Sequence, residues 1–128
     1  MPNSVAAVRV AITAGARSVS KQNAPAYAAL SDGTVDIPDA TPAATEFAIP
    51  FGAVTDATML YVENKSGQDM TPKINGGAAL NDIPHLGFLL VSAAALPAGT
   101  QLTSFSLTTT DEVTPAGSLE YMVLGDPA

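Results

Sequence analysis

The chain of 128 residues has no cysteine and no tryptophan, and only 13% of its residues are charged. The absence of cysteine excludes thiolate metal ligands, thiol nucleophiles and disulfides. The charged share is about half of what ordinary soluble domains carry. Because a lone globular protein with so few charges is poorly protected against association, we expect partners to cover part of its surface.

Basic residues are few, and they are unevenly placed. Arg9, Arg17 and Lys21 precede the first carboxylate, Asp32, so the N-terminal segment carries +3. The rest of the chain contains two lysines and all 12 acidic residues, so this part carries a charge of −10. The two parts together give the formal net charge of −7. This polarity suits a basic arm that reaches from an acidic body onto an acidic surface of another protein.

The same distribution argues against nucleic acid and membrane partners. The acidic body lacks a clustered basic footprint for phosphates, and no aromatic residue lies between Arg9 and Lys21 to stack on bases. The most apolar stretch, residues 87–96, is far shorter than the ~20 residues of a membrane span. The first residues show no secretory pattern, so synthesis in the cytoplasm is expected.

Residues 1–24 are predicted to form an extended N-terminal arm. Within it, Val8, Val10 and Ile12 alternate with small or charged residues, the period-two pattern of a half-buried strand. Such a strand can pair with a sheet edge, either in its own domain or in a neighbouring subunit.

Residues 25–128 are predicted to form one all-β sandwich domain, because turn residues recur about every ten residues from Thr45 onward. Before this point, residues 31–44 are predicted as a long irregular connection, because they contain two prolines, one glycine and three aspartates. Tight turns are predicted at residues 64–67 and 75–77, and short helical turns at residues 25–30 and 91–96. The predicted strands are residues 46–50, 58–64, 69–74, 86–91, 102–109 and 119–124.

Alternation along these strands predicts which side chains enter the core. The opposite faces of two strands are not strongly polar, which indicates that they meet protein rather than water. The predicted core residues are Leu60, Val62, Phe105, Leu107, Leu119, Tyr121 and Val123. The residues on the second faces are Ser104, Ser106, Thr108, Met122 and Leu124.

No pattern predicts catalysis. His85, the only histidine, follows Asp82 closely, but no nucleophile accompanies the pair and no Gly-x-Ser-x-Gly motif is present. Asp111 and Glu112 are adjacent, whereas glycoside hydrolysis needs two carboxylates that flank a sugar bond. We expect a protein that is not an enzyme.

No metal or cofactor is predicted either. Asp32, Asp36 and Asp39 could offer oxygen ligands to calcium, but an EF-hand that started at Asp32 would have Ile37 at its glycine position and Ala43 at its glutamate position. Solvated turn aspartates are the favoured interpretation. The glycines at residues 76–77 match no phosphate-binding loop and fit a hairpin turn.

Residues 60–77 (LYVENKSGQDMTPKINGG), 107–110 (LTTT) and 118–127 (SLEYMVLGDP) resemble small virion proteins of tailed bacteriophages, most of all capsid decoration (cement) proteins. The resemblance implies a β-sandwich, often of jelly-roll type, that binds outside an expanded shell. There it would bridge neighbouring capsomers through loops and a terminal arm. No shared motif assigns a role to a particular residue.

We therefore expect a jelly-roll-like virion protein on the capsid surface, with the major capsid protein and further copies of itself as partners. Two alternatives stay open: another virion component, such as a head fibre base, tail protein or head–tail adaptor, and a carbohydrate- or receptor-binding sandwich. The residues expected to contact the partner are Val8, Arg9, Val10, Ile12, Arg17 and Lys21.

Overall fold

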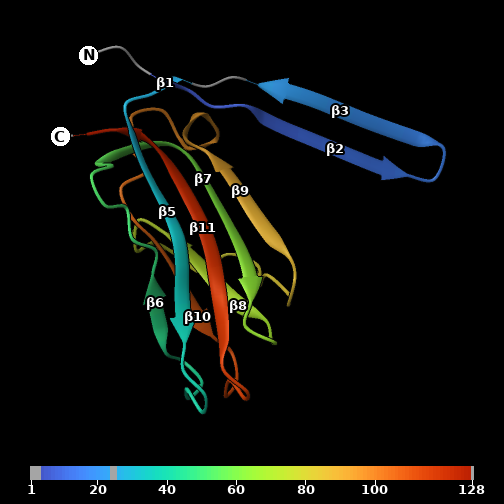
Figure 1. Ribbon diagram of the computed structural model, residues 1–128, viewed down its shortest axis with the longest axis vertical. Helices are drawn as coiled ribbons and strands as arrows, with labels where there is room; N and C mark the ends of the chain where they lie inside the picture. Colours follow the sequence, from blue (N-terminus) through green and yellow to red (C-terminus); the bar gives the residue numbers. More distant parts are fainter. Residues whose placement is uncertain (1–3, 24–25, 128) are drawn as a thin grey trace.

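The computed structural model, which describes residues 4–23 and 26–127, is a sandwich of two antiparallel sheets with a long hairpin projecting from one end (Figure 1). One sheet has the strand order β5-β11-β7-β9 and the other has the order β6-β10-β8. The strands of the sandwich are β5 (Ala29–Ile37), β6 (Glu46–Ala48), β7 (Asp56–Lys65), β8 (Met70–Ile74), β9 (Phe88–Ser92), β10 (Phe105–Thr109) and β11 (Gly117–Asp126).

Consecutive strands alternate between the two sheets all the way from β5 to β11. The segment between β8 and β9 adds two isolated bridges to β8, from Ala79 to Lys73 and from Ile83 to Met70, at the place of an eighth strand. A chain that crosses between two sheets at each connection wraps the sandwich in the manner of a jelly roll. The predicted all-β, jelly-roll-like sandwich is thereby confirmed.

The core lies between the two sheets and begins, in the described residues, at Ala29. Leu60, Val62, Leu107 and Val123 are fully buried there, as their alternation predicts. The remaining predicted core residues, Phe105, Leu119 and Tyr121, also pack in this cluster. Among the described residues of the N-terminal arm, none belongs to this core cluster, so we expect the sandwich not to depend on the arm for its apolar packing.

One predicted turn is confirmed and the other is wrong. Asn75 and Gly76 both have positive φ, and the Gly77 N–H donates to the Ile74 carbonyl at 2.9 Å, which is a type I′ turn. Residues 64–67 close no hairpin, because β7 and β8 lie in different sheets. The buried Asn64 side chain builds an arch there: its amide donates to the carbonyls of Gln68 and Ile83, each at 2.7 Å.

Two further predictions are wrong, and one is correct in part. Residues 31–37 are not irregular but belong to β5, and residues 26–30 contain strands rather than a helical turn. Asp32 and Asp36 led to the wrong prediction because they lie on the solvated face of β5, while Val35 and Ile37 pack inward. In residues 91–96 the helical part is a single 3-10 turn, η1 (Ala93–Ala95).

The N-terminal segment forms a hairpin of two strands, whereas the sequence predicted only one strand in the arm. β2 (Val8–Ala14) pairs with β3 (Arg17–Asn23) around Gly15 and Ala16, and Gly15 has a φ of +60°. Glycine at the first position of a two-residue loop is typical of a type II′ turn. The short ladder of β1 (Ser4–Val5) with β4 (Ala26–Tyr27) keeps the same register.

Candidate interaction surface

The hairpin β2–β3 is a two-stranded ribbon that extends past the edge of the sandwich at β9 (Figure 1). In the described ranges, no hydrogen bond joins residues 8–22 to the sandwich. Ile12 and Val19 lie opposite each other near its tip and are 60% and 50% exposed. Since an isolated two-stranded hairpin is marginally stable in water, this ribbon is suited to pack against a partner.

Exposed apolar side chains also gather on the outer face of the sheet β5-β11-β7-β9. Phe88 is 62% exposed and Met122 is 43% exposed, and Leu30 is exposed as well. Together with Ile12 and Val19, these residues make up five of the seven exposed large apolar side chains of the described chain. Their concentration on the hairpin and on one sheet face marks an interaction surface.

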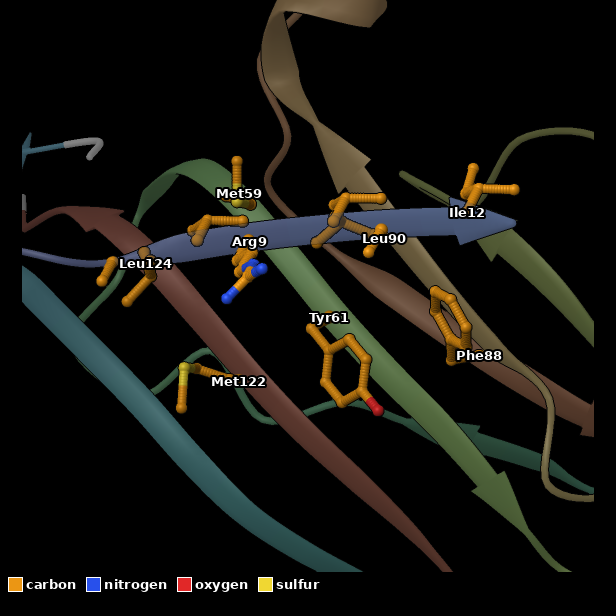
Figure 2. Close-up of a pocket in the computed structure, with 12 residues that line it drawn as sticks. Arg9, Ile12, Met59, Tyr61, Phe88, Leu90, Met122 and Leu124 are labelled. Atoms are coloured by element: carbon orange, nitrogen blue, oxygen red, sulfur yellow. The ribbon is translucent and has the colours of Figure 1, made fainter. Parts of the chain in front are cut away.

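Between the hairpin and this face lies an open groove of about 630 Å³ (Figure 2). Residues of β2 line one side, and side chains from β7, β9 and β11 line the other. We call this second side the apolar floor, and its residues are Met59, Tyr61, Phe88, Leu90, Met122 and Leu124. Tyr61 and Phe88 are neighbours on the floor, with ring centroids 6.0 Å apart.

Beyond the apolar floor the same sheet face is acidic. The register places Glu63 directly opposite Glu120, and Asp32 next to Met122. Like charges that face each other across a ladder repel. Lys65 relieves part of this repulsion through an ion pair with Glu120 at 2.8 Å, and this hydrogen bond raises the pKa of Lys65.

Glu63 forms no ion pair among the described residues, where the only ion pair is that of Lys65 with Glu120; the Glu63 carboxylate acts on Lys65 at longer range, as a smaller cause of the raised pKa of Lys65. It accepts a hydrogen bond from the Tyr61 hydroxyl at 3.3 Å. Burial of the phenol, and then the nearby Glu63 carboxylate, raises the pKa of Tyr61, so Tyr61 stays a neutral donor. The acidic band can therefore accept a cation from outside.

The structure brings four of the six predicted contact residues to the groove: Val8, Arg9, Val10 and Ile12. Arg17 begins β3 at the hairpin tip, is exposed, and forms no ion pair within the described chain. Lys21 lies opposite Val10 in the ladder, and its side chain lies outside the described part.

Sequence reasoning missed most of the apolar floor. It marked Met122 and Leu124 as a second face that meets protein, and Leu124 is indeed buried while Met122 lines the groove. Tyr61 and Met59 alternate with the core residues of β7, so every position from Met59 to Val62 is apolar or aromatic. That unbroken run was the available signal for a strand covered on both faces.

The other candidate residues do not assemble into a site. His85 is exposed, and its Nδ1 accepts a hydrogen bond from the Gly67 N–H at 3.0 Å, whereas Asp82 accepts from the Thr71 hydroxyl at 2.7 Å. Asp111 accepts from the Glu112 N–H at 2.7 Å within one turn.

Within residues 4–23 and 26–127, no three histidine or acidic side chains cluster in a way that could hold a metal ion. Asp32 and Asp36 lie on β5, and Asp39 follows it. The described helical structure offers no segment with the length and apolarity to cross a membrane.

No family model matches the sequence, and no curated protein matches it. Among solved structures, the chain is similar to the cupin domain of Cnp3 from Schizosaccharomyces pombe, with a TM-score of 0.43 and 10% sequence identity. This match covers 94% of the present chain and 88% of that domain.

Proposed function

We propose that the protein is a non-enzymatic virion component that binds the outer surface of a tailed-bacteriophage capsid and cements neighbouring capsomers. The observation that carries this proposal is the basic hairpin, which projects from an acidic sandwich and exposes Ile12 and Val19 at its tip. A projecting element with apolar and cationic side chains can add to a neighbouring surface by strand pairing or packing.

The mechanism is mechanical. Packaged DNA pushes capsomers apart, and a protein bound across their junctions adds interface free energy that separation must overcome. The protein stabilises the closed lattice in proportion to its higher affinity for that state. The residues assigned to the contact with the major capsid protein are Val8, Arg9, Val10, Ile12, Arg17 and Lys21.

The absence of enzymatic activity is part of the proposal. Its support is the placement of His85 and Asp82: the His85 Nδ1 accepts from the Gly67 N–H and the Asp82 carboxylate accepts from the Thr71 hydroxyl, so each bonds to a different neighbour. A dyad would require the histidine to bond to both a nucleophile and an orienting group.

Neutralising the basic residues of the arm tests the contact. The variant Arg9→Ala/Arg17→Ala/Lys21→Ala is expected to bind expanded shells about 10- to 100-fold more weakly at low salt, because charge pairs across an interface contribute to steering and affinity. Its binding should also depend less on salt concentration. Cosedimentation with shells that lack the protein, over a salt series, measures both quantities.

Lys73→Ala is the matched control, because it removes a positive charge from β8 in the sandwich rather than from the hairpin. It should bind as the wild type does. Wild-type affinity and salt dependence in the triple variant would contradict the electrostatic part of the proposal.

A further inference from the structure

We infer that the apolar floor, together with the neighbouring acidic residues Glu63 and Glu120, binds the hairpin tip of a second copy of this chain. Two copies then exchange hairpins. The inference concerns the protein in solution and goes beyond its proposed attachment to a capsid. A second copy is the occupant because the chain itself carries a segment that complements this surface in both apolarity and charge.

The hairpin tip and the floor both expose apolar side chains. On the hairpin, Ile12 and Val19 form a cross-strand pair on one face and are at least half exposed. On the floor, Phe88 and Met122 are the exposed members, 62% and 43% exposed. Burial of apolar surface of this kind contributes about 25 cal/mol per Å² that is removed from water.

The charge match is specific to the same face. Arg17 pairs with Ala14, and Val19 pairs with Ile12. Side chains two residues apart on a strand share one face, so Arg17 lies on the same face as the Ile12–Val19 pair and next to it. On the sheet, Glu63 lies directly opposite Phe88 of β9 on one side and Glu120 of β11 on the other. A hairpin tip that covers Phe88 would therefore bring Arg17 close to the Glu63 carboxylate, which forms no ion pair among the described residues.

Geometry makes an exchange possible. The hairpin runs over its own sheet, where Val8 and Val10 are half-buried and Ile12 lines the groove, and its end continues beyond the edge strand β9 (Figure 1). A second copy related by a twofold axis can offer its own floor to this tip and receive the other tip in return. Such an interface is isologous and closes at two copies.

The exchange leaves another hairpin face for the capsid. Arg9, Ala11 and Thr13 alternate with the residues assigned to the second copy and lie opposite Gln22, Ser20 and Ser18. This polar face remains outside the exchanged contact. On this face of the hairpin Arg9 is the only basic residue, because Arg17 and Lys21 lie on the same face as Ile12. The exchanged contact must therefore open before Ile12 and Arg17 can meet the capsid as proposed above.

Sedimentation equilibrium of the purified full chain, without any capsid, tests the inference. The wild type is expected to have twice the mass of one chain. Arg17→Glu and Glu63→Lys should each weaken dimerisation at least tenfold, because each places like charges together at both contacts of the dimer. The double variant Arg17→Glu/Glu63→Lys should regain the dimer, and so should an equimolar mixture of the two single variants.

Asp111→Lys is the matched control, because it makes the same charge change as Glu63→Lys on the loop between β10 and β11, at the opposite end of the sandwich from the hairpin (Figure 1). It should remain dimeric. Thermal melting of each variant distinguishes loss of the dimer from loss of the fold.

A wild type that stays monomeric at about 100 μM would overturn the inference. A dimer that neither single variant weakens, or that the double variant does not restore, would also overturn it. Because no capsid is present in this assay, either result is distinguishable from a failure of the proposed capsid binding.

Discussion

Removing residues 1–24 is expected to leave a folded sandwich that no longer binds an expanded capsid. The affinity should fall by about 100-fold or more, which corresponds to about 2.7 kcal/mol. The fold should survive because, in the described chain, the core contains no residue before Ala29. Cosedimentation with shells and circular dichroism of the truncated chain measure the two effects.

The truncation also tests the predicted boundary between an arm of residues 1–24 and a sandwich domain of residues 25–128. A cooperative thermal transition in the truncated chain would support this division. An unfolded product would refute it, and undiminished capsid binding by a folded product would refute the role of the arm. The full-length Lys73→Ala variant serves as the binding control, because its arm is intact.

Replacing Gly125 by alanine is expected to cause the largest loss of stability of any glycine-to-alanine replacement in the chain. Gly125 is buried in β11 beside a register shift, and an added Cβ would overlap the Asp56 carbonyl oxygen and lie 2.7 Å from the Ala57 Cα. These are backbone atoms of the neighbouring central strand, so no side-chain rotation can make room. We expect a loss of about 4 kcal/mol in the free energy of unfolding.

Gly99→Ala is the control for this substitution. Gly99 has a φ of +81° with no heavy atom within 4 Å of the added Cβ, so alanine there brings only backbone strain of about 1–2 kcal/mol. Urea unfolding of both variants gives the two losses. Equal losses would show that the contact between β11 and β7 at Gly125 has room for a side chain.

The sandwich could be predicted from the sequence because its central strands alternate clearly. Phe105 and Leu107 of β10 are two positions apart, as are Leu60 and Val62 of β7, and all four enter the core. β5 was missed because Asp32, Gly33 and Asp36 are typical turn residues. In the fold, a side chain at Gly33 would lie 3.1 Å from the Tyr121 hydroxyl, and its φ is +151°, so tertiary packing favours glycine within this strand.

The candidate surface could be predicted only in part. The alternation of Val8, Val10 and Ile12 correctly marked β2 as a strand, but β3 has the sequence RSVSKQN with Val19 as its only apolar residue. Its pairing could have been predicted only from the glycine of the two-residue loop. The apolar floor combines residues of β7, β9 and β11, and no local pattern reveals which distant strands become neighbours.

The most direct test of the central claim is cryo-electron microscopy of the native particle that contains this chain. The account predicts sandwich density on the outside of the shell at junctions between capsomers, with residues 8–23 in contact with the capsid lattice. A particle in which the chain lies away from the shell, or in which this hairpin contacts no capsid protein, would contradict it.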